Sequence, residues 1–104
     1  MTHEVFVTAR AAADVTKACD WIARDSTAEA IRWHDRCTEA IASLAEYPRR
    51  CPVAVESESV GLDVRQLHFG RYRILFIIEG QTVKVVHVRH GARRAFGRAD
   101  LGLS

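Results

Sequence analysis

The fold is decided by residues 62–90, which read LDVRQLHFGRYRILFIIEGQTVKVVHVRH. Three segments of this stretch are rich in β-branched and aromatic side chains, which is typical of β-strands. These segments are residues 62–69, 71–79 and 82–90. Gly70 and Gly80 separate them. Because glycine is favoured in tight hairpin turns, the pattern predicts an antiparallel meander of three strands.

Two-residue turns at these glycines would place Phe69 opposite Tyr72 and Glu79 opposite Thr82. Alternate residues of a strand point to opposite faces of the sheet, so this register sorts the side chains into two sets. The set predicted to form the core is Leu67, Phe69, Tyr72, Ile74, Phe76, Ile78, Val83 and Val85. The other set is Val64, Gln66, His68, Arg71, Arg73, Leu75, Ile77, Lys84, Val86, Val88 and His90.

The N-terminal half is predicted to be helical after a short strand at residues 3–8. Residues 9–24 carry apolar side chains at helical spacing. A second helix begins after Ser26, because Ser26 and Glu29 have the spacing of a capping box. It ends before Pro48, since proline disfavours a helical residue in front of it. The short turn between the two helices predicts an antiparallel helical hairpin.

This order of elements, β-α-α-β-β-β, predicts an α+β fold in one domain, residues 1–104, with the helical hairpin on one face of an antiparallel sheet. The polar residues 49–61 are predicted to be an irregular loop. The second face is predicted to be exposed and apolar in its middle, and a soluble monomer rarely leaves such a patch bare. A protein partner is therefore expected over Leu75, Ile77, Val86 and Val88.

The composition excludes several classes of protein. The 104 residues are 48% hydrophobic and 27% charged, which is ordinary for a soluble globular protein. There is no apolar run of about 18 residues and no signal peptide at residues 1–4, so we expect a cytoplasmic protein with no membrane partner. Three cysteines at no familiar spacing argue against a disulfide framework. His34 and Cys37 have no second pair of ligands elsewhere in the sequence, so no metal site is expected, and no cofactor is expected either.

Positive charge is concentrated in the C-terminal third. The formal net charge is only +2, yet residues 65–98 hold eight basic side chains against a single acidic one, Glu79. This clustering, and the preference for Arg over Lys, favour an anionic partner. The basic residues are Arg65, Arg71, Arg73, Lys84, Arg89, Arg93, Arg94 and Arg98, and His68, His87 and His90 lie among them.

Three segments of the sequence resemble the ParE/RelE superfamily of bacterial toxins from type II toxin–antitoxin modules. This superfamily includes plasmid stabilisation proteins. The three segments are AIASLAEYP at residues 40–48, GRYRILF at 70–76 and VHVRHGARR at 86–94, and the likeness covers nearly the whole chain. It implies a small growth-inhibiting toxin that is neutralised by an acidic antitoxin encoded beside it. Operator DNA would be bound only through the antitoxin complex.

The superfamily divides into ribosome-dependent mRNA endonucleases of the RelE kind and ParE-like inhibitors of DNA gyrase. RNA cleavage through the 2′-hydroxyl needs a base, an acid and cations around the phosphorane. When the sequence is aligned with RelE, the resemblance implies that Arg73 corresponds to the catalytic Arg on the sheet of RelE. Arg93 then corresponds to the second catalytic Arg. The Lys pair of the RelE site falls on Val64 and Gln66, and its Tyr falls near Ala99. We therefore expect a non-enzymatic ParE-like toxin, with the ribosome-dependent nuclease as the alternative and a degenerate member without toxicity as a third reading.

If the chain is a nuclease, the superfamily pattern of Glu, Arg and a C-terminal His implies Glu56 or, as our preferred candidate, Glu58, together with Arg73 and His90. The assumed register places His90 on the same face as Arg73. It also predicts that Tyr72→Ala destabilises the domain and that Arg73→Ala is tolerated. The residues expected to bind a target or an antitoxin are Arg65, His68, Arg71, Arg73, Arg89, Arg93, Arg94 and Arg98.

Overall fold

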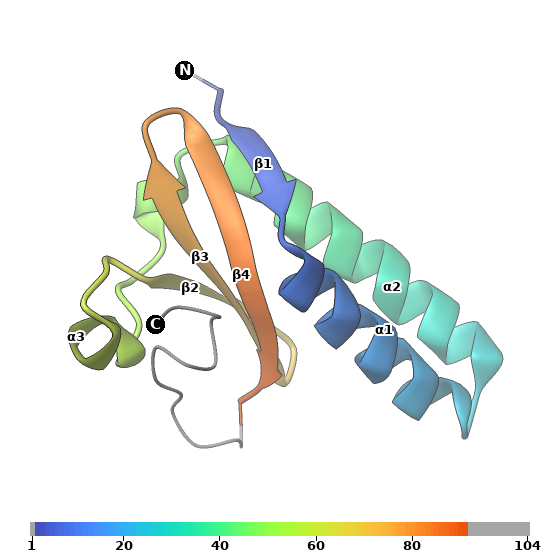
Figure 1. Ribbon diagram of the computed structural model, residues 1–104. Helices are drawn as coiled ribbons and strands as arrows, with labels where there is room; N and C mark the ends of the chain where they lie inside the picture. Colours follow the sequence, from blue (N-terminus) through green and yellow to red (C-terminus); the bar gives the residue numbers. More distant parts are fainter. Residues whose placement is uncertain (1, 92–104) are drawn as a thin grey trace.

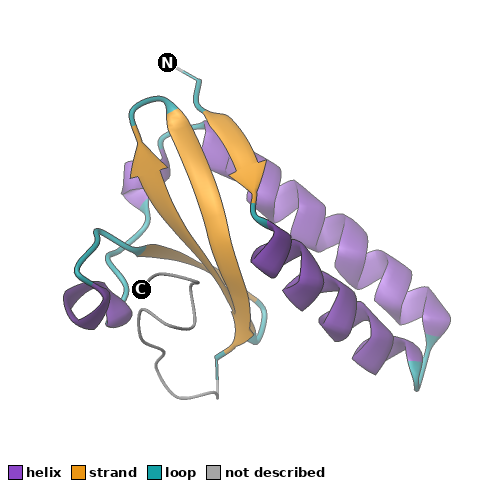
Figure 2. Cartoon of the chain, in the orientation of Figure 1, coloured by secondary structure: helices purple, strands orange, loops and turns teal. Residues whose placement is uncertain are grey.

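In the computed structural model, which describes residues 2–91, a four-stranded sheet carries a helical hairpin on one face and a short helix on the other (Figures 1 and 2). The elements in chain order are β1 (Glu4–Val7), α1 (Ala9–Ala23), α2 (Thr27–Ala42), two 3₁₀ turns (Ser43–Ala45 and Pro48–Arg50), α3 (Glu56–Val60), β2 (Arg65–Phe69), β3 (Tyr72–Glu79) and β4 (Thr82–His90). The α+β class and the order β-α-α-β-β-β are confirmed, with α3 as an additional element.

The meander of β2, β3 and β4 has the predicted turns. Phe69 pairs with Tyr72 and Glu79 pairs with Thr82. Gly70 has a φ of 58°, in the left-handed region that a two-residue hairpin turn requires and that glycine adopts without strain. The glycine pattern therefore identified both hairpins correctly.

The sheet is mixed, because its strand order is β1-β4-β3-β2 and β1 runs parallel to β4, with Glu4 beside Thr82 and Val7 beside Val85. This differs from the antiparallel sheet that we predicted. The chain leaves β1 through the helical hairpin and comes back to the same edge only after β2 and β3, so β1 and β4 point the same way (Figure 1).

A β-bulge changes the face assignment near the end of β4. Leu75 pairs with His87, but the next residue of β3, Phe76, pairs with Val85, which leaves Val86 as the extra residue. The insertion reverses the alternation beyond it. Val88 consequently lies in the core beneath the helices, and His90 contacts Tyr72 on that same face. Our prediction that these two residues share the face of Arg73 was wrong, since a bulge leaves no signal in this run of β-formers.

Side-chain caps begin both long helices. The Thr8 hydroxyl accepts a hydrogen bond from the Ala11 amide, 3.2 Å, at the start of α1. The Ser26 hydroxyl accepts one from the Glu29 amide, 3.1 Å, at the start of α2, as its spacing predicted. None of the helices among residues 2–91 is long and apolar enough to cross a membrane.

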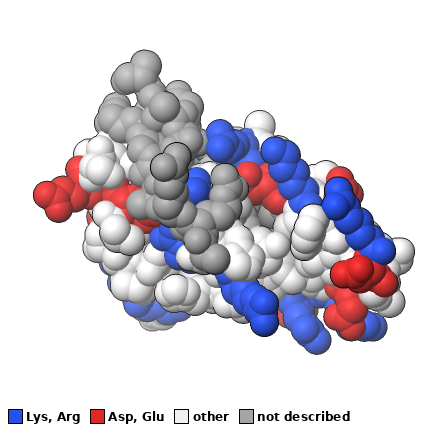
Figure 3. All heavy atoms as spheres, turned by 90° about the horizontal axis from the view of Figure 1, so that it is seen from below, with Lys and Arg blue, Asp and Glu red and all other residues white. Residues whose placement is uncertain are grey.

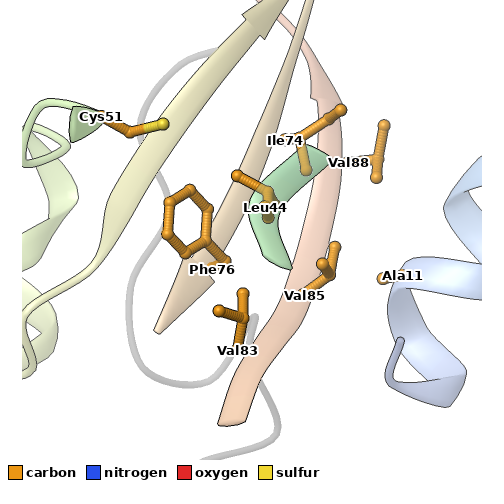
Figure 4. Packing of buried hydrophobic residues seen from close by; sticks show 8 residues of the cluster. All are labelled: Ala11, Leu44, Cys51, Ile74, Phe76, Val83, Val85 and Val88. Atoms are coloured by element: carbon orange, nitrogen blue, oxygen red, sulfur yellow. The ribbon is translucent and has the colours of Figure 1, made fainter. Parts of the chain in front are cut away.

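The main core lies between the helical hairpin and the sheet. Figure 4 shows side chains from both layers meeting there. Four of the predicted core residues, Ile74, Phe76, Val83 and Val85, are fully buried, while Tyr72 is half-buried at the margin of the cluster. The complete set is Ala11, Leu44, Cys51, Ile74, Phe76, Val83, Val85 and Val88.

A second apolar cluster covers the opposite face of the sheet. Ala54 and Val60 pack with Val64 and Leu75 from the sheet side, and the half-buried Ile77 and Val86 adjoin them. The segment predicted to be an irregular loop therefore forms a 3₁₀ turn and α3, and it folds back onto the sheet. Our expectation of a bare patch on this face was wrong, because the chain covers it with its own apolar residues.

Candidate functional site

The most constrained charged group of the described structure is a buried ion pair between α3 and β3. Arg73 donates from Nη1 to Glu56 Oε1 at 2.9 Å and from Nη2 to Glu56 Oε2 at 2.6 Å. Gln66 Oε1 accepts a further hydrogen bond from Arg73 Nη1 at 3.0 Å. Glu56 is fully buried and Arg73 is 8% exposed. Such a bidentate pair is the strong form of a charge-assisted hydrogen bond.

This geometry stabilises the charged form of both partners. The hydrogen bonds from Arg73 hold the pKa of the Glu56 carboxyl below its usual range, although burial acts in the opposite direction. The same contact raises the pKa of the Arg73 guanidinium above its ordinary value. Arg73 is therefore a cation already neutralised inside the protein.

A second polar network stands beside the first, because Arg73 and Arg89 are directly opposite each other on β3 and β4. Arg89 Nη1 lies 3.1 Å from His87 Nε2, and His87 Nδ1 is hydrogen-bonded to Asp14 on α1. A guanidinium has only donors, so His87 Nε2 is the acceptor in its contact with Arg89. His87 is fully buried between Arg89 and Asp14.

Asp14 also joins α1 to the backbone of β4. Its Oδ2 accepts a hydrogen bond from the Val88 amide at 3.0 Å, at a point beyond the end of the β1–β4 pairing. The Val88 amide is on the edge of β4 that β1 leaves unpaired, because the pairing of β1 ends at Val85. The Asp14 carboxylate therefore provides the acceptor for this amide. The network fastens the helical hairpin to the sheet.

Of the residues predicted for a nuclease site, the structure brings together only Glu56 and Arg73, and Glu58 and His90 lie apart from them. Glu58 is exposed on α3, and its neighbour Glu56 is the carboxylate that binds Arg73. His90 lies on the other face of the sheet from Arg73, with its ring edge-on to Tyr72 at 5.3 Å between centroids. His87 and Asp14, which had no predicted role, occupy the buried network instead.

A comparison with protein families identifies the chain. The model of the ParE toxin of type II toxin–antitoxin systems, parDE, matches residues 5–95. The chain belongs to the ParE toxin family. This match confirms the resemblance that we inferred from the segments at residues 40–48, 70–76 and 86–94. No curated protein matches this ParE-family toxin.

Two solved structures share its fold. One is the chromosomal ParDE toxin–antitoxin system from P. aeruginosa, with a TM-score of 0.70 and 18% identity over 86% of this chain and 96% of that one. The other is the toxin–antitoxin complex RelBE2 from Mycobacterium tuberculosis, with a TM-score of 0.55 and 23% identity over 86% of this chain and 99% of that one. At these identities, the likeness shows the fold of the ParE-family toxin and nothing finer.

The basic residues predicted for binding fall into different environments. Arg65 donates to the backbone oxygens of Arg49, at 3.2 Å, and Cys51, at 2.9 Å, so it holds the segment before α3. Arg73 and Arg89 are buried, whereas His68 and Arg71 are exposed. The remaining three, Arg93, Arg94 and Arg98, lie outside the described residues.

We examined residues 2–91 for clusters of metal ligands and for reactive cysteine thiols. That part of the chain holds no group of three or more His, Cys, Asp or Glu side chains that could bind a metal ion. Burial raises the pKa of the Cys37 thiol to about 11, and it also raises the pKa of Cys51. Because the thiolate is the reactive form of cysteine, both side chains are inert at neutral pH.

Proposed function

We propose that this ParE-family toxin arrests growth by binding DNA gyrase and that it does not cleave RNA. The Glu56–Arg73 pair is the observation that carries the proposal. A nuclease of the RelE kind needs cationic side chains that contact the phosphorane and stabilise the negative charge that develops on it. Arg73, which matches the sheet Arg of RelE-like sites, is buried and bound by a carboxylate, so its charge is already compensated.

The positions of His90 and His87 also support a toxin without nuclease chemistry. A general acid or base has to lie within hydrogen-bond reach of the reacting group. His90 faces the helical hairpin, away from Arg73, and packs against Tyr72. His87 is buried, with one ring nitrogen bonded to Asp14 and the other to Arg89. His90 is therefore on the wrong face to act with Arg73, and His87 is buried away from solvent.

The proposal includes a cognate acidic antitoxin, encoded beside the toxin, which neutralises it and carries it to operator DNA. The excess of basic residues in 65–98 is complementary to an acidic partner, and the exposed His68 and Arg71 are accessible to it. The two structural relatives were solved from ParDE and RelBE2 toxin–antitoxin systems. Binding to gyrase places the action of the toxin in the cytoplasm.

Inducible expression without antitoxin tests the target. We expect growth arrest with loss of DNA supercoiling and induction of the DNA-damage response, while transcripts stay intact. His90→Ala should leave this toxicity largely unchanged. Replacing Arg93, Arg94 and Arg98 together by Ala should abolish it, because we expect the basic C-terminal segment to contact the target. Defined transcript cuts with unchanged supercoiling would reject gyrase as the target.

A further inference from the structure

An aromatic hollow opens between the helical hairpin and the turn that joins β2 to β3. Its volume is about 510 Å³, and Trp21, Trp33, Arg36, Arg71, Tyr72 and His90 are among its lining residues. A neighbouring hollow of about 560 Å³ shares Trp21, Tyr72 and His90 with it and adds Lys17. The two hollows thus adjoin at these three residues, and we call the pair the aromatic hollow.

The walls of the aromatic hollow are pre-organised by edge-on ring contacts. The Trp33 ring lies 5.1 Å from the Tyr72 ring at an interplanar angle of 62°, and 5.7 Å from the Phe69 ring at 56°. Tyr72 in turn meets His90 at 76°. Aromatic pairs prefer such tilted geometries, so the wall needs little reordering when a ligand binds.

The rim of the aromatic hollow is basic. Trp21 is 64% exposed, and the Arg24 guanidinium lies over its ring at 4.9 Å. Lys17, Arg36 and Arg71 add further positive charge. The acidic Asp14 also lines it, but that carboxylate is engaged by His87 and the Val88 amide. In the view from below, Lys and Arg side chains border uncharged surface in the helical half, with Asp and Glu side chains among them (Figure 3).

We infer that the aromatic hollow binds a protein segment in which an apolar side chain is flanked by Asp or Glu. Trp, Tyr and Arg are the residues that most often supply the binding energy of protein interfaces. The tilted rings line a space for an apolar side chain, and the basic rim attracts the acidic flanks. The inference does not depend on gyrase as the target, since it rests on the chemistry of this surface alone.

A nucleic acid fits the same surface less well. Single-stranded nucleic acids stack their bases on open ring faces. The Trp33 ring contacts the rings of Tyr72 and Phe69, and the Tyr72 ring also contacts His90. Arg24 lies over one face of the Trp21 ring. The geometry thus favours an apolar side chain over a planar base.

The chain contains only two tryptophans, and both line the aromatic hollow, so their indole N–H signals report directly on it. The experiment is an NMR titration of the full-length protein with a short synthetic peptide that carries one Leu between Glu residues. We expect both indole signals to shift with saturable binding. A peptide with Lys in place of Glu, and a short single-stranded oligonucleotide, should bind at least about tenfold more weakly.

Matched variants locate the binding. Trp21→Ala should weaken the binding of the acidic peptide by about tenfold or more, which is the effect expected when a residue that anchors an interface is removed. Phe6→Ala removes another exposed aromatic side chain, 56% exposed on β1, and should leave the affinity unchanged. Arg36→Glu should weaken binding, whereas Arg32→Glu, one helical turn away on α2 and outside the lining, should not.

Three results would overturn the inference. One is the absence of indole shifts up to about millimolar peptide. Another is an equal loss of affinity in Trp21→Ala and Phe6→Ala, which would indicate nonspecific binding. The third is tighter, Trp21-dependent binding of the oligonucleotide, which would assign the hollow to nucleic acid. Because gyrase is not part of the titration, these results are independent of the proposed target.

Discussion

The Glu56 carboxylate and the Arg73 guanidinium form a bidentate pair, with contacts of 2.9 and 2.6 Å, between α3 and the interior strand β3. Together with the apolar contacts of Ala54 and Val60, this pair fastens the segment before β2 onto the sheet. The residue that resembles a catalytic arginine is therefore part of the architecture of this ParE-family toxin.

Removing Arg73 should strongly destabilise the protein, contrary to our expectation from the sequence. Arg73→Ala leaves the Glu56 charge buried without its partner, which typically costs ~3–5 kcal/mol. The double variant Glu56→Leu/Arg73→Met replaces the pair by apolar groups and should recover most of that loss. Urea unfolding measures both, with the exposed Arg71→Ala as a control that should cost under ~0.5 kcal/mol. Equal losses for Arg73→Ala and Arg71→Ala would contradict this assignment.

The same pair predicts acid sensitivity. The hydrogen bonds from Arg73 lower the pKa of Glu56 in the folded state. A carboxyl whose folded pKa is lowered contributes stability above its unfolded pKa, about 4.3 for Glu, and loses it as the pH falls through the folded value. Unfolding free energies measured from about pH 6 downward should therefore fall more steeply for the wild type than for Glu56→Leu/Arg73→Met. Parallel curves for the two proteins would show that Glu56 is not the responsible group.

Asp14 should matter more than its exposed neighbours on α1. Asp14→Ala leaves the Val88 amide and His87 Nδ1 without their acceptor, and each such buried donor costs about 1–3 kcal/mol. Asp20→Ala changes an exposed carboxylate on the same helix and should have little effect. Hydrogen exchange gives a local measurement, because the Val88 amide should lose protection in Asp14→Ala only. Unchanged Val88 protection in that variant would contradict the contact.

Tyr47 is held in a strained backbone conformation. Its φ of 46° and ψ of 57° lie in the left-handed region, which costs a residue with a Cβ roughly 1–2 kcal/mol, and its side chain is 76% exposed. Arg50 holds the turn by donating to the Tyr47 carbonyl oxygen at 3.2 Å. Tyr47→Gly should therefore raise the melting temperature, whereas Tyr47→Ala, which keeps a Cβ, should not. The opposite ranking in thermal melts would mean that the strain is relieved in solution.

Much of the fold was predictable because its signals are local. The glycines between the strands specify the two hairpin turns, and Ser26 with Glu29 specifies the start of α2. Each signal acts through groups that are close in sequence. Pattern and propensity were therefore sufficient for these elements.

The site was less predictable, because it depends on contacts between distant segments. The bulge at Val86 sits in a run of β-formers with no glycine to mark it, and it moves His90 to the other face. Glu56 and Glu58 lie in the same polar segment, and only the packing of α3 selects Glu56 as the partner of Arg73. The pairing of Asp14 with His87 joins residues 73 positions apart and leaves no local signature.

The central claim is that Arg73 has a structural role and that the toxin does not cleave RNA. Two assays on purified components test it most directly: supercoiling by DNA gyrase, and the integrity of an mRNA on ribosomes. We predict that the wild type and Glu56→Leu/Arg73→Met both inhibit supercoiling and that neither cuts the mRNA. Defined cuts by the wild type on ribosomes, lost in His90→Ala, would contradict it.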